Sequence, residues 1–316
     1  MYHDKDDQEE IHMIQKEVLE IFPQRLQRLL QPSVPDWQTL EEIRIRCGKV
    51  PVLKIRGKKY ETGKSGDAVT QREIREIVDS ISRYSLYAFE EEVKKGYLTI
   101  PGGHRVGMTG KVLMERGEVR AFRNLVFLNV RISHEMIGCS DSLMPYFFQG
   151  DQFLSTLIVS PPGAGKTTLL RDIVRNLANG GKEYEPFTVA VIDERSEIAG
   201  CYQGVPQKDV GRHCDVLDGC EKAEGIHRMI RSMSPEVVAV DEIGTKRDCE
   251  ALGEALTSGC GLIATVHGRS IRHLLEKPSL NRILEAGMFE RIVFLSGGEV
   301  GRVQAIYDGK GKEKIL

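Results

Sequence analysis

A run of nine residues, Ser160–Thr168 (SPPGAGKTT), carries the residue types of a phosphate-binding loop. Gly163 and Gly165 let the backbone turn its N–H groups inward around a triphosphate, and the start of the helix expected next adds unpaired donors and a partial positive charge. Lys166 has the position that reaches the β- and γ-phosphates, and the Thr167 hydroxyl has the position that binds Mg²⁺. The run therefore predicts a site for a nucleotide and its magnesium ion.

The surroundings of this run agree with that prediction. An apolar strand-like stretch, Leu157–Val159, precedes it, and a helix-like one, Leu169–Leu177, follows. Ser160 stands where the strict pattern has glycine, which leaves the part that touches phosphate intact. The alternative is a glycine-rich turn of a plain α/β domain, which does not require Gly-Lys-Thr-Thr in sequence. The residues expected to bind the nucleotide are Pro162, Gly163, Ala164, Gly165, Lys166, Thr167 and Thr168.

A second chemical pattern follows the apolar stretch Val237–Val240, which ends in Asp241-Glu242. This is the pattern of a Walker B strand. We expect Asp241 to hold the metal with its water shell and Glu242 to act as the general base that orients the attacking water. The alternative is a buried strand that ends in a solvated acidic pair.

Two more expected strands end in chemical groups. Asp193-Glu194 follows one of them, and His267 comes just after another. We take Glu194 as the carboxylate that reaches the metal or the water; the alternative is an ordinary surface salt-bridge cluster with the neighbouring Arg195 and Glu197. These groups complete the predicted catalytic set within the second half of the chain.

A GTPase-like pattern overlaps the second acidic motif. Asp241–Gly244 fits D-x-x-G, and Thr245–Asp248 fits the T-K-x-D motif that reads guanine. In a GTPase these motifs end different strands, tens of residues apart. Here the second begins directly after the first, so it cannot reach the base while Asp241 serves the metal. We therefore expect ATP, although no residue proves the base preference.

The second half of the chain alternates strands and helices, which predicts a mainly parallel sheet with active groups at the strand ends. We expect an α/β, RecA-like P-loop domain over residues 153–316. Its strands are expected near Thr156–Val159, Thr188–Ile192, Val237–Val240, Gly261–Thr265 and Arg291–Leu295.

The first half has a different pattern. Residues 11–30 have apolar side chains at helical spacing, interrupted at Pro23, residues 42–55 alternate like paired strands, Gln71–Val93 reads as helix, and Tyr97–Ile132 as a β-meander with glycine turns. We therefore predict a flexible N-terminus over 1–10, a smaller α+β domain over 11–138, and a linker over 139–152 with a helix near Ser140–Phe148.

The amino-acid composition limits the class of protein to which this chain can belong. The 316 residues include 44 Lys/Arg and 46 Asp/Glu, a net charge of −2, so bulk binding of a polyanion is not expected. The first ten residues have no apolar signal region, and no apolar run reaches the roughly 18–20 residues of a membrane span. Seven cysteines without C-x-x-C fit reduced thiols. We expect a cytoplasmic protein without a membrane span.

Taken together, these motifs resemble the secretion ATPases of type II and type IV systems and the pilus motors, and within them the stage III sporulation protein AA family of endospore-forming bacteria. The resemblance covers about residues 10–305. The stretches that carry it are Ser160–Asp172, Val191–Gly200, Asp215–Cys220, Ile230–Glu236, Gly102–Gly107, Asn129–Ile132 and the histidine box Ala264–His267.

The resemblance implies an ATPase in the mother-cell cytoplasm, peripheral to the membrane through inner-membrane subunits of a secretion-like channel between mother cell and forespore. It also implies a ring, expected to be a homo-hexamer, and a role for His267 in sensing the γ-phosphate or coupling hydrolysis to motion. Family members often complete the site with arginines, for which we take Arg105 and Arg131. Further candidates are Arg123, Arg212 and Arg231.

Two other functions remain open on the same core. A nucleic-acid motor is not favoured, because aromatic residues make up only 6% of the chain and no basic stretch interleaves them into a stacking platform. A scaffold that binds ATP and scarcely hydrolyses it is disfavoured by Glu242 but not excluded by it.

Overall fold

The computed structural model describes residues 12–83, 96–115, 117–297 and 301–316. Contacts divide the chain into two compact units, Met1–His134 and Glu135–Leu316. We expected the first domain to end at residue 138 and a linker to follow, whereas residues 139–152 pack within the second unit, where Ser140 and Phe147 are fully buried. The expected helix near Ser140–Phe148 is replaced by turns and a short 3-10 helix, η6 (Met144–Phe147).

The first unit is built on a six-stranded antiparallel sheet in the order β3-β2-β1-β6-β5-β4. Its strands are β1 (Leu40–Arg46), β2 (Val52–Ile55), β3 (Lys58–Glu61), β4 (Tyr97–Ile100), β5 (His104–Glu115) and β6 (Glu118–Arg131). Its helices are residues 12–19, α2 (Gln24–Leu30) and α3 (Gln71–Ile81), with 3-10 turns η1 (Gln31–Ser33), η2 (Trp37–Thr39), η3 (Ser65–Asp67) and η5 (Pro101–Gly103).

One face of this sheet and the helices share a core. Buried apolar side chains alternate with more exposed ones along parts of β1, β5 and β6, as the period of two requires, and Ile43, Val106 and Val130 are fully buried. Ile74 and Ile77 of α3 belong to the same cluster. The predicted helix from Gln71 ends at Ile81 in the structure, and residues 84–95 lie outside the described residues.

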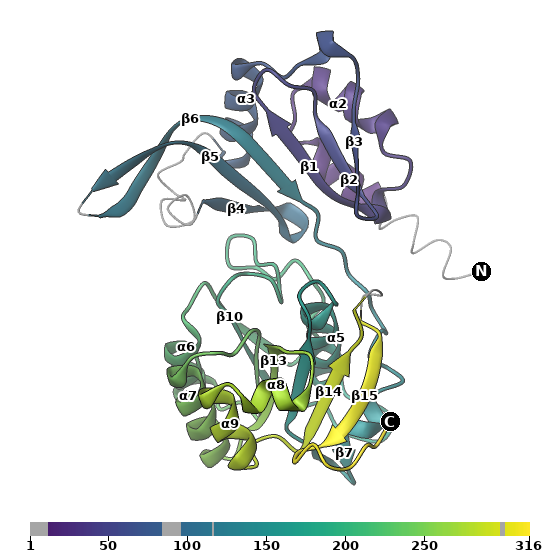
Figure 1. Cartoon of the computed structure of the whole chain (residues 1–316), viewed down its shortest axis with the longest axis vertical. Helices are drawn as coiled ribbons and strands as arrows, with labels where there is room; N and C mark the ends of the chain where they lie inside the picture. Colours follow the sequence, from purple (N-terminus) through teal and green to yellow (C-terminus); the bar gives the residue numbers. More distant parts are fainter. Residues whose placement is uncertain (1–11, 84–95, 116, 298–300) are drawn as a thin grey trace. The chain divides into compact units, whose positions relative to one another are not determined.

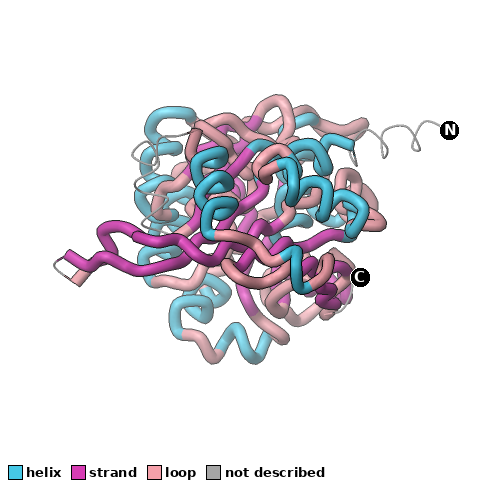
Figure 2. The backbone as a smooth tube through the Cα atoms, turned by 90° about the horizontal axis from the view of Figure 1, so that it is seen from above, coloured by secondary structure: helices cyan, strands magenta, loops and turns pink. Residues whose placement is uncertain are grey.

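The β5–β6 hairpin extends beyond its neighbours as a two-stranded ribbon. The pairing of β1 with β6 stops at Phe127, and that of β4 with β5 stops at Gly107. Beyond those points the two strands pair only with each other, and Figure 2 shows them as a long magenta ribbon.

The second unit contains a seven-stranded sheet in the order β11-β10-β12-β13-β9-β14-β15, parallel except for β15. Its strands are β9 (Thr156–Ser160), β10 (Val189–Asp193), β11 (Cys214–Asp218), β12 (Val237–Val240), β13 (Gly261–His267), β14 (Arg291–Leu295) and β15 (Val303–Asp308); a small hairpin pairs β7 (Phe148–Gln149) with β8 (Gln152–Phe153). Its helices are α5 (Lys166–Asn179), α6 (Lys222–Met233), α7 (Lys246–Thr257), α8 (Ile271–Leu275) and α9 (Pro278–Glu285).

Helices cover both faces of this sheet (Figure 1). The apolar side of α5 packs with Ile158 of β9 in one cluster, whereas α6, α7 and α9 pack with Leu157 and Val159 in the other. The central strands are therefore apolar on both sides, which explains their continuous apolar runs. The five strands predicted from the sequence are present, and the mainly parallel α/β class is confirmed. β11 and β15, which mix polar and apolar residues, were not predicted.

Candidate nucleotide site

The loop between β9 and α5 has the backbone of a phosphate cradle. Gly163 and Gly165 adopt left-handed φ angles of 76° and 86°, which favour glycine. Gly165 is the N-cap of α5, and no side chain caps this helix end. The first N–H groups of α5 are therefore available to an anion. The loop is held on its inner side, where the amide of Gly301 donates to the carbonyl of buried Ala164 at 2.9 Å.

Lys166 and Glu242 meet at the start of this helix. The Lys166 side chain is 10% exposed, and its Nζ lies 2.7 Å from Oε1 of Glu242. His267, at the end of β13, brings Nε2 to 3.0 Å from the same oxygen. Burial opposes ionisation of Glu242, but the contacts with Lys166 and the nearby charges of His267 and Arg195 outweigh it and hold its pKa below the usual range.

A second cluster joins Thr167, Asp241 and Thr265. The Thr167 hydroxyl donates to Oδ2 of Asp241 at 2.5 Å, and the hydroxyl of fully buried Thr265 donates to Oδ1. A hydroxyl and a carboxylate facing one another are oxygen donors of the kind that Mg²⁺ prefers. The structure thus brings together the two residues that the sequence assigned to the metal.

Glu242 has an unusual backbone. Its φ angle is 57°, in the left-handed region that costs a residue with a side chain about 1 kcal/mol or more. Two bonds hold this conformation, because the amide of Glu242 donates to Oγ1 of Thr265 at 2.9 Å and the amide of Ile243 donates to the Thr265 carbonyl at 2.9 Å. The carboxylate is thereby turned from the end of β12 toward Lys166.

The two residues of the acidic pair at the end of β10, Asp193 and Glu194, have different roles. Asp193 is buried and accepts hydrogen bonds from the amides of Glu197, Ile198 and Ala199, so it shapes the loop; burial raises its pKa to about 6. Glu194 forms an ion pair with Lys222 at the start of α6. It nonetheless lines the same small hollow, of about 260 Å³ and partly open to solvent, as Asp241 and Glu242.

Arg195 is a site residue that the sequence analysis treated only as an alternative partner for the acidic pair. Its NH1 lies 2.6 Å from Oε2 of Glu242. The two residues are 47 positions apart, and an arginine in a polar loop carries no local signal that identifies its partner. The strand order of the structure explains the contact, because β10 and β12 are neighbours and their carboxyl ends lie close together.

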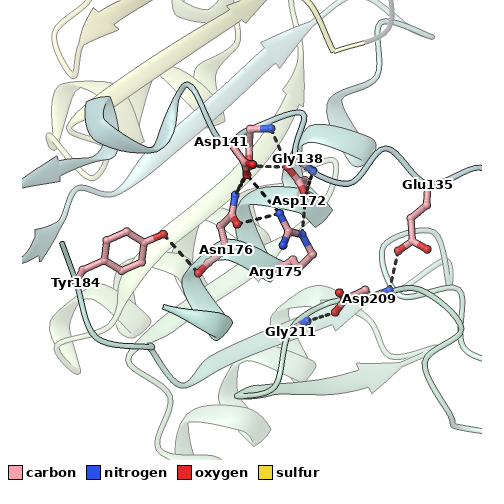
Figure 3. A network of polar contacts seen from close by, with 10 residues as sticks. Glu135, Gly138, Asp141, Asp172, Arg175, Asn176, Tyr184, Asp209 and Gly211 are labelled. Carbon is pink, nitrogen blue, oxygen red and sulfur yellow. Dashed lines mark hydrogen bonds and ion pairs between the residues drawn. The ribbon is translucent and has the colours of Figure 1, made fainter. Parts of the chain in front are cut away.

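The helix that carries Lys166 is anchored at its middle by the polar network of Figure 3. The buried carboxylate of Asp172 accepts from the amides of Gly138 and Ser140, at 3.0 and 2.7 Å, and from the Ser140 hydroxyl at 2.8 Å. Nε of Arg175 donates to it at 2.7 Å. These bonds fix the segment that enters the second unit onto α5.

The guanine-reading pattern serves another purpose. Thr245 is the N-cap of α7, its side chain accepts from the amide of Asp248, and the Asp248 carboxylate accepts in return from the amide of Thr245. This is a capping box, which satisfies the first amides of a helix. Asp248 is 5% exposed and therefore unavailable to a base.

The arginines named from the sequence are distributed over both units. Arg105 of β5 and Arg131 of β6 face each other in the register of the first unit's sheet, and Arg105 stacks 3.9 Å from the centre of the Tyr97 ring. The side chain of Arg123 lies outside the described part of the chain. Arg212 and Arg231 are exposed in the second unit.

Comparison with solved structures defines the class. The fold matches the ATPase DotB of Yersinia pseudotuberculosis with a TM-score of 0.57 at 16% identity, over 86% of this chain and 75% of that one. It matches the pilus retraction motor PilT, solved with bound ADP, with a TM-score of 0.56 at 15% identity, over 92% and 82% of the two chains. At such identities the likeness establishes the fold, which is that of the P-loop secretion ATPases.

The chain belongs to the sporulation stage III, protein AA family, whose model matches residues 12–314. It is 44% identical over 298 residues to stage III sporulation protein AA of Bacillus subtilis (strain 168), an alignment that covers 93% of this chain and 95% of the relative. The resemblance identified from the motifs is confirmed. Among the described residues, no helix combines the length and apolar character needed to cross a membrane.

Proposed function

We propose that this chain is a Mg²⁺-dependent ATPase that converts ATP and water to ADP and phosphate. The observation that carries the proposal is the meeting of Lys166 and His267 on Glu242 beside the Thr167–Asp241 pair. The glycine loop and the uncapped start of α5 fit the phosphates of a nucleotide. The facing hydroxyl and carboxylate fit a hard cation.

Each group has a defined task in this reaction. The loop amides from 163 to 168 bind the phosphates, and Lys166 exchanges Glu242 for the phosphate oxygens and neutralises their charge. Thr167 and Asp241 would hold Mg²⁺, which when bound would withdraw charge from the phosphate oxygens. The carboxylate of Glu242, once released by Lys166, accepts a hydrogen bond from the attacking water. His267 contacts the same carboxylate and is our candidate for sensing the γ-phosphate.

The acidic group after β10 has a supporting task. Glu194 lines the hollow next to Asp241 and Glu242 and is held there by Lys222. In the proposal Glu194 would reach the metal or the attacking water, and its ion pair with Lys222 holds the carboxylate at the hollow.

We place the activity in endospore formation, as a motor or assembly ATPase of a secretion-like channel complex between mother cell and forespore. Membership of the sporulation family and the secretion-ATPase fold support this assignment. In this proposal the protein works in the mother-cell cytoplasm as a homo-hexamer and binds inner-membrane subunits. Arg105 and Arg131 remain our candidates for arginines that approach the nucleotide from a neighbouring subunit.

The test is steady-state ATP hydrolysis over a wide range of protein concentration, with the mass measured at each point. Lys166→Ala and Glu242→Gln are compared with Lys246→Ala, which removes an exposed lysine of α7 that pairs with Glu250. We expect specific activity to rise as subunits assemble, to be lost in the first two variants and to be retained in the third.

Two outcomes would favour the alternative functions. ATP binding without turnover at any assembly state would indicate a nucleotide-gated scaffold. An affinity for single-stranded DNA that falls steeply with salt would indicate a motor on nucleic acid.

A further inference from the structure

Arg195 holds the oxygen of Glu242 that Lys166 leaves untouched. NH1 of Arg195 lies 2.6 Å from Oε2, whereas Lys166 and His267 both contact Oε1. We infer that Arg195 is a positioning residue, which fixes the Glu242 carboxylate through Oε2 so that Oε1 faces the attacking water. The inference rests on the proposed function, because it assigns a task only if Glu242 is the base.

The loop that presents Arg195 is braced from several directions. The Asp193 carboxylate gathers three amides of residues 197–199 at 2.8 to 2.9 Å. The hydroxyl of Ser196 donates to Asp218 at 2.7 Å. Arg171 of α5 donates to the carbonyls of Glu197 and Ile198, the former at 2.7 Å. The backbone that carries Arg195 is therefore held in place, although the Arg195 side chain is 57% exposed.

Nucleotide binding affects the contacts of the two carboxylate oxygens of Glu242 in different ways. Lys166 is the phosphate ligand of the loop, so a bound triphosphate draws its ammonium group away from Oε1. Arg195 lies after β10 rather than in the phosphate loop, so its contact with Oε2 remains when Lys166 moves from Glu242 to the phosphates. The carboxylate is then held by Arg195 at Oε2 and by His267 at Oε1, and the position on Oε1 that Lys166 has left can accept a hydrogen bond from a water, which is the arrangement that positioning a water requires.

The ion pair itself is a poor source of stability. Arg195 is more than half exposed, and exposed pairs contribute little to folding. Its removal is therefore expected to change turnover and leave the folded state intact. This separates a positioning role from a structural one, because a structural arginine would lower the melting temperature when replaced.

The experiment compares Arg195→Gln and Arg195→Lys with Arg228→Gln, which removes an exposed arginine of α6 that pairs with Glu224. We expect Arg195→Gln to lower kcat by about 10- to 100-fold, the range that a small misplacement of a reacting group produces. KM for ATP and the affinity for ADP are expected to stay within about two-fold. Arg195→Lys should restore part of kcat, and Arg228→Gln should match the native chain.

A double-mutant cycle with Glu242→Gln decides whether Arg195 acts through Glu242. If it does, adding Arg195→Gln to Glu242→Gln leaves the residual rate unchanged. The inference is overturned if Arg195→Gln keeps or raises kcat, if the loss falls on KM, or if it recurs in full without Glu242.

The same set of variants also tests the proposed function itself. A native chain without turnover, or a fully active Glu242→Gln, would remove the base on which both conclusions depend. An inactive Glu242→Gln beside a fully active Arg195→Gln would overturn the inference alone.

Discussion

Replacing Asp172 by alanine tests how firmly α5 is anchored. The Asp172 side chain is 4% exposed, and Arg175, which donates to it, is 14% exposed. The substitution removes the acceptor of four hydrogen bonds and leaves the Arg175 guanidinium with weaker partners, Asn176 at 2.9 Å and Asp141 at 3.4 Å. Breaking a buried ion pair on one side costs about 3–5 kcal/mol. Because those two partners remain, we expect the lower end, a loss of about 3 kcal/mol in the free energy of unfolding.

The assay is urea unfolding of the full chain, followed by a signal from the second unit. A loss of this size should lower the urea midpoint by about 1 M or more at an unchanged slope. Asp141→Ala is the matched control, because Asp141 belongs to the same network but its side chain is 65% exposed. We expect it to cost less than about 1 kcal/mol.

The pH dependence of this difference has a definite sign. Burial opposes ionisation of Asp172, but hydrogen bonds from Ser140, Arg175 and Gly138 outweigh it and lower its pKa. A carboxyl group whose pKa is lower in the folded state stabilises the fold above its unfolded pKa and loses that contribution as the pH falls. The gap between the native chain and Asp172→Ala should therefore narrow below about pH 4. Equal losses in the Asp172 and Asp141 variants, or a gap independent of pH, would refute the reasoning.

Three further substitutions probe the packing and the site. Gly225→Ala places a Cβ 2.6 Å from Cγ2 of Ile192 and should lower the free energy of unfolding, measured by heat or urea, by about 1–3 kcal/mol. Gly253→Ala is the control, because its Cβ meets only the flexible end of a methionine at 3.1 Å, and its effect on stability should be neutral or favourable. Thr265→Val keeps the side-chain shape but removes the hydrogen bonds of the Thr265 hydroxyl with Asp241 and with the Glu242 amide. We expect kcat for ATP hydrolysis to fall by about ten-fold or more. An unchanged kcat would count against the assignment.

Much of this fold and of the site was predictable because the informative signals are local. The phosphate loop is a continuous run, and the strand before Asp241 is apolar throughout because both of its faces are buried. The convergence of Lys166, Asp241 and His267 then follows from the rule that parallel strands place their carboxyl ends at one edge.

What the sequence did not reveal depends on distant partners. β11 (CDVLD) is an edge strand of the sheet and mixes polar and apolar residues without a regular alternation, so its sequence resembles a loop as much as a strand. The task of Arg195 is set by a carboxylate 47 positions away, and the burial of Asp172 by a segment more than 30 residues earlier. Side chains of this kind become identifiable only when the strand order and the paths of the loops are known.

The bonds from Arg171 have a consequence for how this protein can vary. Arg171 is 5% exposed and donates to the main-chain carbonyls of residues 197 and 198, and the Asp193 carboxylate accepts from main-chain amides of the same loop. Every residue type other than proline offers the same peptide groups. These bonds to the main chain do not depend on the side chain at 197, which is only half-buried, so substitutions at 197 can accumulate without displacing Arg195, whereas Ile198 is fully buried in the core and is not free to vary in this way. A single change at Arg171 or Asp193 has no such freedom, because no neighbouring residue can replace the bonds that each one makes.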